Sequence, residues 1–497
     1  MTAPGWSVHL PAGLAFDPAQ LAARALPAAW SAHWRAAPDR PALADDRGGA
    51  LSWGALEAES ARAAGKLARA GLAPGDRVLM SAGSSLALAV AHVACLRLGL
   101  AVVPANPASP AAELAQLVDE ARPRAALLDE PGRLARRDAL LVTPPALDLA
   151  AGPVPALDRV APEAIALLAY TSGTTGRPKG VPLSHGNLHA TAEALRIAWR
   201  WTADDRLVHA LPLFHMHGLG VALHGTLQAG ASALLLPRFE PEAVLDAVEA
   251  HAATLFFGVP TMWHRLVESP RAGVLARLRL AVSGSAALAP ELYARIAACA
   301  GQACLERYGM TETGMLVSNP VDGARVPGAV GYPLPGVELR LAPSGEIEVR
   351  GPNVFAGYLD RPEANAAAFT PDRWFRTGDL GTLDPEGRLR IVGRAKELVI
   401  SGGYNVHPRE VEEALLAHPA VREAAVVGTP SPEWGEVVTA YLVSDREIPL
   451  AELRAHLRER LAAYKHPRLA HRVAALPRNA LGKVQRHRLR DGCVVPD

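Results

Sequence analysis

The segment with the clearest chemistry spans residues 170–180 and reads Tyr170-Thr-Ser-Gly-Thr-Thr-Gly-Arg-Pro-Lys-Gly180. Four Ser and Thr hydroxyls, three glycines and one lysine lie within it, directly after an apolar run over 165–169. Glycine lets backbone N–H groups approach an anion closely, and with hydroxyls and a lysine such a loop can hold a polyphosphate. The candidate phosphate-binding residues are Thr171, Ser172, Gly173, Thr174, Thr175, Gly176 and Lys179.

The two alternatives for this segment are a Walker A loop and an ordinary turn. A Walker A loop requires Gly-Lys-Ser/Thr at the start of a helix, whereas Lys179 is followed by Gly180 and Val181. The composition alone also fits an ordinary Ser/Thr/Gly turn, so the phosphate interpretation depends on what surrounds the loop.

The elements that must position this loop alternate between strands and helices. Residues 54–71 have an amphipathic helical pattern, and further helices are expected at 85–98 and 111–120. Between and after them the expected strands are 77–80, 101–104 and 124–128. After residue 200 the rhythm returns, with strands expected at 207–211, 233–236, 254–257, 278–282 and 304–307. This alternation predicts βαβ units and parallel sheets.

The pattern changes after about residue 335. Short alternating strands at 338–341, 346–350 and 388–392 indicate a small antiparallel sheet or barrel. The last segment has helices at 408–417 and 450–462 and strands at 423–427 and 437–442, which is typical of a compact α+β unit. We therefore expect an α/β protein with an N-terminal domain (1–393), which includes the barrel-like subdomain, and a small C-terminal domain (394–497).

Composition narrows the classes of function. The chain has 497 residues, of which 49% are hydrophobic and 20% charged, so it is globular and large enough for more than one domain. Lys and Arg total 51 against 50 Asp and Glu, for a net charge of +1. Such a balance provides no bulk field for nucleic acid or an anionic membrane, and any anionic ligand must be recognised by local groups.

The location expected from the sequence is the cytoplasm. Four scattered cysteines are too few for a disulfide framework, which favours a reducing compartment. The longest apolar stretch, 86–105, is interrupted by His92 and Arg97, so it does not read as a membrane span. The N-terminus lacks the basic start and apolar core of a signal peptide.

The chain resembles the adenylate-forming superfamily, which includes acyl-CoA synthetases, stand-alone adenylation domains and beetle luciferases. The 170–180 loop resembles the family's phosphate-binding loop. Other family-like segments follow in order: Leu-Pro-Leu-Phe-His-Met-His-Gly at 211–218, Ser-Gly-Ser-Ala-Ala-Leu at 283–288, Glu-Arg-Tyr-Gly-Met-Thr-Glu at 306–312, Trp-Phe-Arg-Thr-Gly-Asp at 374–379, Gly-Arg-Ala-Lys-Glu at 393–397 and Pro-Arg-Asn-Ala-Leu-Gly-Lys at 477–483. The resemblance implies an AMP-forming acid–thiol ligase that uses ATP, Mg²⁺ and CoA.

The resemblance also implies roles at the nucleotide. Glu312 would be the Mg²⁺ ligand, since a hard cation prefers carboxylate oxygens. Thr311 would place a hydroxyl near the α-phosphate, and the Asp379 carboxylate would accept hydrogen bonds from both ribose hydroxyls. Arg394 would be the second ribose contact, and Tyr308 and Gly284 would flank the adenine. Ser285 and Gly309 would be further nucleotide contacts.

In the family a lysine equivalent to Lys483 bridges the substrate carboxylate and the α-phosphate, where negative charge develops. The C-terminal domain then rotates about a hinge that matches Lys396, and CoA enters. The segment expected to line its path contains Ser401, Gly402 and Gly403.

His215 is expected near the acyl site or the pantetheine tunnel in this family. His209, His217 and His224 lie close to it in sequence, so a metal site is conceivable. No cluster of Cys or Asp completes such a site, and core or gating histidines are commoner.

Two arginines indicate which acid is activated. Arg307 precedes Tyr308 at the strand end that lines the family's acyl pocket, and Arg265 closes the loop expected after a buried strand. An unpaired charge in such a pocket is costly, so an anion is expected there, and a dicarboxylate suits a guanidinium. These segments resemble those of malonyl-CoA synthetases, so we expect malonate, or methylmalonate, as substrate. Alternatively, Arg307 pairs with Glu306 or with another internal acid.

Other functions stay open at this stage. The chain could ligate another short-chain, medium-chain or aryl acid, load a carrier-protein thiol, or bind nucleotide without turnover. We expect small-molecule substrates, no nucleic acid or membrane partner, and a monomer or homodimer.

Overall fold

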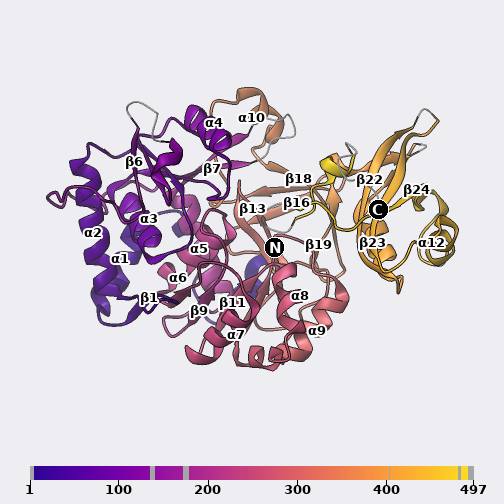
Figure 1. Cartoon of the computed structure of the whole chain (residues 1–497), viewed down its shortest axis with the longest axis horizontal. Coiled ribbons are helices and arrows are strands. Elements are labelled where there is room, and N and C mark those ends of the chain that lie inside the picture. Colours follow the sequence, from indigo (N-terminus) through magenta and orange to yellow (C-terminus); the bar gives the residue numbers. More distant parts are fainter. Residues whose placement is uncertain are drawn as a thin grey trace. The chain divides into compact units, whose positions relative to one another are not determined.

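The computed structural model describes residues 5–134, 140–171, 178–401, 403–431, 433–478 and 483–490 (Figure 1). The chain divides into two compact units. The first comprises Met1–Gly284, Pro290–Leu339 and Val349–Phe375, and the second comprises Ser285–Ala289, Arg340–Glu348 and Arg376–Asp497. Both units mix helices with sheets, which confirms the predicted α/β class.

One sheet of the first unit carries the ends of the predicted phosphate loop. Among the described residues it has six strands in the order β6-β5-β3-β4-β7-β8. The pairs from β6 to β7 are parallel, and β7 and β8 form an antiparallel pair. The strands are β3 (Arg77–Ser81), β4 (Ala101–Pro104), β5 (Ala125–Leu128), β6 (Leu141–Thr143), β7 (Ile165–Thr171) and β8 (Lys179–Ser184). The helices in this stretch of chain are α2 (Trp53–Arg69), α3 (Leu86–Leu98) and α4 (Ala111–Ala121), as the alternating pattern predicts.

A second sheet of the first unit has nine described strands in the order β15-β14-β13-β12-β11-β9-β10-β1-β2. Its central pairs, from β13 to β1, are parallel, and its outer pairs are antiparallel. The strands are β1 (Pro41–Asp45), β2 (Ala50–Ser52), β9 (Arg206–His209), β10 (Ser232–Leu235), β11 (Leu255–Gly258), β12 (Leu280–Ser283), β13 (Leu305–Met310), β14 (Gly314–Ser318) and β15 (Tyr332–Pro333). Every residue of β11 and β12 is buried, as expected for parallel strands covered on both faces.

Helices precede or connect the strands of the nine-stranded sheet. They are α1 (Leu26–Ala36), α5 (His185–Ala198), α6 (His224–Ala229), α7 (Pro241–Ala250), α8 (Pro260–Glu268) and α9 (Pro290–Ala300), with a π-helix, η4, at His217–Leu223. No helix built from the described residues combines the length and the apolar character needed to cross a membrane.

Two sheets follow toward the C-terminus. The first has the order β16-β17-β18-β19, with β16 at Glu338–Leu341, β17 at Glu346–Arg350, β18 at Phe375–Leu383 and β19 at Leu389–Arg394. The second comprises β20 (Val399–Ser401), β21 (Tyr404–Val406), β22 (Val421–Ser431), β23 (Gly435–Ser444) and β24 (Leu469–Arg472). The helical segments are α10 (Pro362–Ala368), η6 (Ala395–Glu397), α11 (Pro408–Leu416), α12 (Leu450–Leu457) and α13 (Arg486–Arg490).

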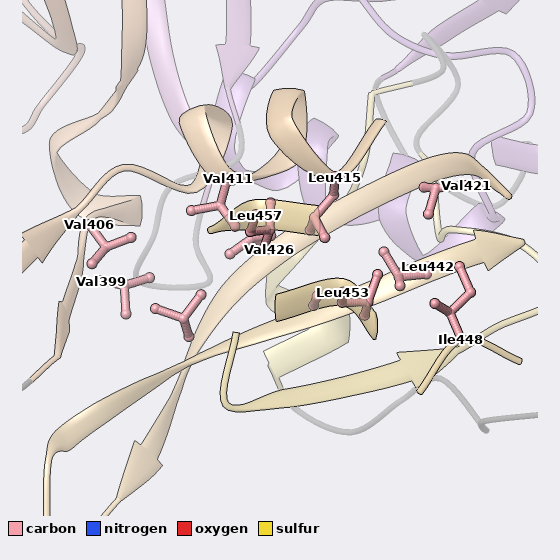
Figure 2. Packing of buried hydrophobic residues seen from close by; sticks show 12 residues of the cluster. Val399, Val406, Val411, Leu415, Val421, Val426, Leu442, Ile448, Leu453 and Leu457 are labelled. Atoms are coloured by element: carbon pink, nitrogen blue, oxygen red, sulfur yellow. The ribbon is translucent and has the colours of Figure 1, made fainter. Parts of the chain in front are cut away.

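Alternation along β22 and β23 gives the last sheet two apolar faces. Val426 and Leu442 point into a core that also contains Leu415 of α11 and Leu453 of α12 (Figure 2). Their neighbours in sequence, including Val427, point into a second core that contains Leu489 of α13. Since side chains alternate along a strand, a single hairpin binds helices on one face and the C-terminal segment on the other.

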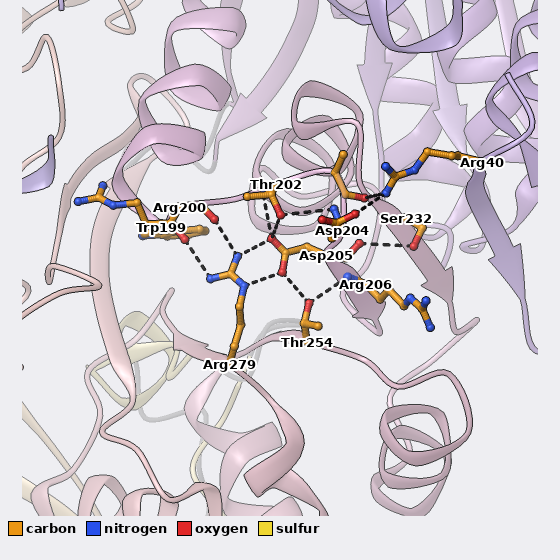
Figure 3. A network of polar contacts seen from close by, with 11 residues as sticks. Arg40, Trp199, Arg200, Thr202, Asp204, Asp205, Arg206, Ser232, Thr254 and Arg279 are labelled. Atoms are coloured by element: carbon orange, nitrogen blue, oxygen red, sulfur yellow. Dashed lines mark hydrogen bonds and ion pairs between the residues drawn. The ribbon is translucent and has the colours of Figure 1, made fainter. Parts of the chain in front are cut away.

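A polar network fixes one edge of the nine-stranded sheet (Figure 3). Asp205, Thr254 and Arg279 directly precede β9, β11 and β12, which are neighbours in the sheet. The buried Asp205 carboxylate accepts hydrogen bonds from Arg279 Nε and Nη2 at 2.5 Å and from Thr254 Oγ1 at 2.7 Å. The network therefore clamps the amino ends of three parallel strands and leaves their carboxyl ends to carry other groups.

Replacing Asp205 by Ala should destabilise the first unit. Burial raises the pKa of Asp205, but hydrogen bonds from Arg279, the Thr202 N–H and Thr254 outweigh burial and lower it. Losing the carboxylate leaves these donors unsatisfied, so we expect the free energy of unfolding to fall by about 2–4 kcal/mol. Urea unfolding of wild type and Asp205→Ala measures this difference.

Asp204→Ala is the matched control. Among the described residues the Asp204 side chain forms an ion pair only with Arg40, at 2.9 Å, and both side chains are exposed. We expect a loss of at most about 1 kcal/mol. The Asp205 effect should be complete above the pKa of an unfolded carboxyl and vanish as the pH falls through the lowered folded value. Equal losses in the two variants would contradict this account.

Candidate active site

The described ends of the 170–180 loop lie side by side. Thr171 ends β7 and Lys179 begins β8, and the two residues are paired in the antiparallel register. Five other predicted phosphate-binding residues lie outside the described part of the chain: Ser172, Gly173, Thr174, Thr175 and Gly176.

Lys179 and Glu312 are connected through a tyrosine. The Tyr358 hydroxyl donates to Glu312 Oε1 at 3.0 Å, and Lys179 Nζ lies 4.8 Å from the centroid of the Tyr358 ring. Burial raises the pKa of Tyr358, and the neighbouring Glu312 charge raises it further, so the phenol stays protonated and donates. The structure thus places the predicted phosphate-loop lysine at the ring and the predicted metal ligand at the hydroxyl of one phenol.

A tight connection between β13 and β14 presents Glu312. Tyr308 and Gly309 lie in β13, and Thr311 and Glu312 follow directly before β14. A Cβ at Gly309 would lie 2.2 Å from the Gly314 carbonyl oxygen, so only glycine allows this approach. The predicted nucleotide residues Tyr308, Gly309, Thr311 and Glu312 therefore occupy one hairpin, and the Glu312 side chain is buried.

Arg307 is buried against the end of β12. Its side chain is 5% exposed, and a Cβ at Gly284 would lie 2.4 Å from its Cζ, so Gly284 makes room for the guanidinium. Within the described residues, Nε and Nη2 have no hydrogen-bond partner. Burial lowers the pKa of Arg307 to about 9, which leaves the group cationic at neutral pH.

Glu306 does not neutralise this charge. Its carboxylate accepts a hydrogen bond from the Gly328 N–H at 2.9 Å, and adjacent strand residues point to opposite faces. Arg307 thus holds a buried positive charge with donors available to an anion.

Three histidines between residues 209 and 217 lie in the same electrostatic environment. Burial lowers the pKa of His209 and of His215 to about 4. Burial, Arg307 and these two histidines lower the pKa of His217 well below its ordinary value. All three are therefore neutral at pH 7, and they add no positive charge beside Arg307.

His224 belongs to a different cluster. Its Nε2 lies 2.8 Å from His92 Nε2, and the two rings stack. Within the ranges that the structure covers, no group of three or more His, Cys, Asp or Glu side chains is arranged to hold a metal ion.

Arg265 lies elsewhere, which corrects its predicted placement in the acyl pocket. Helix α8 buries Trp263 and Leu266, and Arg265 points outward with its side chain 52% exposed. Its Nη2 pairs with Glu240 Oε2 at 3.3 Å. The predicted placement was wrong because these residues form an amphipathic helix, whose periodicity separates Arg265 from the buried face.

Asp379 and Arg394, the two predicted ribose contacts, are brought together in the second unit. They are cross-strand partners on β18 and β19, and Arg394 Nε lies 3.0 Å from Asp379 Oδ1. Asp379 is buried. Ser285 is exposed and has a φ of 68°, a left-handed conformation that a serine rarely adopts.

Lys483 lies within electrostatic range of that pair. Burial lowers the pKa of Lys483, Arg394 lowers it further, and Glu397 and Asp379 oppose this effect. The structure thus groups the predicted catalytic lysine with both predicted ribose contacts.

The predicted hinge residue precedes β20, and the predicted CoA residues begin at the last residue of that strand. Lys396 is exposed in η6. Ser401 is buried at the end of β20, Gly403 has a φ of 82°, and Gly402 lies outside the described residues. Their roles stay predictions.

Tyr358 and Arg486 were missed by sequence reasoning. Tyr358 contacts Glu312 across 46 residues, and Arg486 contacts Glu412 across 74. Arg486 follows Lys483 by three residues, and this proximity was the one signal available from the sequence.

Family models match both parts of the chain. The AMP-binding enzyme model matches residues 30–359, and the model of the AMP-binding enzyme C-terminal domain matches residues 410–483. Each match includes residues of the candidate site, with Glu312 and Tyr358 in the first and Lys483 in the second.

Several relatives are named as CoA ligases or synthases. The mitochondrial malonate–CoA ligase ACSF3 of Mus musculus is 40% identical over 65% of this chain, and the match covers 64% of the mouse protein. The sulfoacetate–CoA ligase of Cupriavidus necator is 38% identical over 94% of this chain and 96% of its own. A feruloyl-CoA synthase of Amycolatopsis is also 38% identical, over 89% of this chain and 94% of its own.

A solved structure matches the fold. ATP-bound MatB from Rhodopseudomonas palustris is 40% identical with a TM-score of 0.88, covering 94% of this chain and 98% of that one. The chain therefore belongs to the family of AMP-binding enzymes, as an AMP-forming acid–thiol ligase that uses ATP, Mg²⁺ and CoA.

Proposed function

We propose that this ligase joins malonate, or the closely related methylmalonate, to CoA through an acyl adenylate, giving malonyl-CoA, AMP and pyrophosphate. The single observation that carries the choice of acid is the buried Arg307 guanidinium, with two nitrogens unpartnered among the described residues. A second carboxylate on the substrate would satisfy those donors.

The names of the relatives support an acid with a second anionic group without settling it. Malonate carries a second carboxylate and sulfoacetate a sulfonate, and both are anions that a guanidinium can bind. Ferulate has no second acidic group of this kind, so the feruloyl-CoA synthase represents the alternative: a ligase for an aryl or other short- or medium-chain acid.

In the proposed first step, a malonate oxygen attacks the α-phosphorus of ATP and pyrophosphate leaves. Lys179 and the hydroxyls of the 170–180 loop would hold the outgoing phosphates, and Lys483 would stabilise the charge that develops at the α-phosphate. Glu312 suits Mg²⁺, because it is a buried carboxylate whose Oε1 already accepts from Tyr358 and so is oriented. When bound, the metal would neutralise phosphate oxygens.

In the proposed second step, the domain 394–497 moves about Lys396, and the CoA sulfur attacks the acyl adenylate and releases AMP. Ser401, Gly402 and Gly403 would line the path of the thiol. His215 would act near the acyl group as a neutral side chain, in keeping with its lowered pKa. The cytoplasmic location and the monomeric or homodimeric state stay predictions.

A substrate panel tests the proposed function directly. Release of AMP and pyrophosphate is measured with malonate, methylmalonate, acetate, octanoate and benzoate, with and without CoA. We expect malonate or methylmalonate to give the highest kcat/KM and a CoA thioester product. Equal turnover of acetate and malonate would refute the choice of acid while leaving the ligase chemistry intact.

Arg307→Met should weaken malonate binding selectively. Methionine is of similar length but offers no charge or donors, so we expect the KM for malonate to rise by about 10- to 100-fold. The KM for ATP should stay within about two-fold. Steady-state kinetics with each substrate varied in turn measure both effects.

Arg265→Ala is the comparison variant, since it removes an exposed ion pair on α8. It should leave the KM for malonate within about two-fold. A larger effect at position 265 than at position 307 would contradict the assignment of Arg307.

Lys483→Ala should separate the two half-reactions. We expect adenylate formation to fall roughly 10²–10³-fold, because the charge on the α-phosphate loses its partner. Thioester formation from supplied malonyl adenylate and CoA should be largely kept. If the two rates fell together, a role confined to the first step would be ruled out.

A further inference from the structure

Lys483 belongs to a segment that is anchored on both sides. Val484 forms an antiparallel bridge with Arg478, and the Gln485 N–H donates to the Pro477 carbonyl at 2.8 Å. Leu489 is fully buried, and its carbonyl accepts from the Tyr441 hydroxyl at 3.0 Å. The backbone near the lysine therefore has a defined position on the last sheet.

Between these anchors, Arg486 joins two carboxylates. Its Nη2 lies 2.8 Å from Glu412 Oε2 and 2.9 Å from Glu412 Oε1, and its Nη1 donates to Glu397 Oε2 at 3.0 Å. Glu412 Oε1 also accepts from the Val426 N–H of β22 at 2.7 Å. The guanidinium thus ties α13 to α11, to β22 and to η6.

The charges of this group are interdependent. Burial raises the pKa of Glu412, while Arg486 and the Val426 N–H oppose that rise and favour the ionised carboxylate. Burial alone would lower the pKa of Arg486, but Glu412 and Glu397 outweigh it. The net pKa of Glu412 is still raised by burial, and the pairing with Arg486 is what opposes that rise.

Glu397 is shared between two cations. Its charge acts on Lys483 as well as on Arg486, to which it is hydrogen-bonded. Without Arg486 the Glu397 carboxylate would keep its electrostatic attraction for the Lys483 ammonium with no cation of its own, and such attraction is stronger where water is scarce. An ammonium paired in this way is less available to a substrate anion.

We propose that Arg486 is a positioning residue for Lys483: its fork engages Glu412 and Glu397 together, fixes the segment that carries the lysine, and keeps Glu397 from capturing the lysine. This inference rests on the proposed role of Lys483 in adenylate formation. It adds a requirement for that role: the Glu397 carboxylate must be paired with Arg486.

The test compares half-reactions in the full-length protein. Arg486→Met should lower malonate-dependent pyrophosphate release by about 10- to 100-fold, because small misplacements of a catalytic group have effects of this size. Thioester formation from supplied malonyl adenylate should stay within about two-fold, as should the KM for ATP. Arg486→Lys keeps a partly buried positive charge beside Glu412 and should show a smaller loss in the same half-reaction.

A double variant distinguishes positioning from folding. Adding Glu397→Gln to Arg486→Met removes the competing carboxylate, so adenylate formation should recover several-fold relative to Arg486→Met alone. Arg488→Met is the matched control, since Arg488 is exposed on the same helix and, within the described residues, bonds only Gln485. It should change neither half-reaction.

Three results would overturn the inference: equal losses in both half-reactions for Arg486→Met and Arg486→Lys, full activity of Arg486→Met, or no recovery in the double variant. Lys483→Ala is measured in parallel. If it kept full adenylate formation, the proposed function and this inference would both fail. If it lost adenylate formation while Arg486→Met did not, only this inference would fail.

Discussion

The buried charge of Arg307 is the constraint on which the rest of the candidate site depends. Burying a guanidinium is costly unless a partner compensates for lost water, and two of its nitrogens have no partner among the described residues. The protein accommodates it by using glycine at position 284, where any side chain would collide with the guanidinium. An anionic ligand that hydrogen-bonds to the guanidinium would offset this free-energy cost of burial, which favours binding of an anion.

The opposite edge of the same sheet shows how the fold tolerates this cost. Asp205 holds the amino ends of β9, β11 and β12 with a fully engaged carboxylate. The hydrogen-bonded network at these amino ends stabilises the sheet. Gly284 and Arg307 lie toward the carboxyl ends of neighbouring strands of the same sheet. In a parallel sheet the stabilising network and the binding groups can therefore lie at opposite ends of the strands. Ligands of such sheets bind at the carboxyl ends of the strands.

Sequence patterns predicted the elements well where hydrophobic alternation was strong. The strands at 101–104, 338–341 and 346–350 have the predicted bounds, because short buried or alternating runs between turns have few other solutions. Arg265 was misplaced because the segment after β11 was interpreted as a loop rather than as helix α8, whose apolar spacing directs that side chain outward. Tyr358 and the Glu412–Arg486 pair could not be predicted, because contacts between residues so far apart in the chain depend on tertiary packing that no local pattern encodes.

One arrangement recurs in both units. A polyphosphate and its metal need a lysine and a carboxylate near each other, yet a direct ion pair would leave neither available. Tyr358 lies between Lys179 and Glu312, offering its ring to the ammonium and its hydroxyl to the carboxylate. Around Lys483 the competing carboxylate is Glu397, and Arg486 occupies it. In both units a third group thus contacts a member of an opposite-charge pair, and in a chain of net charge +1 the local field at each site must come from such arrangements.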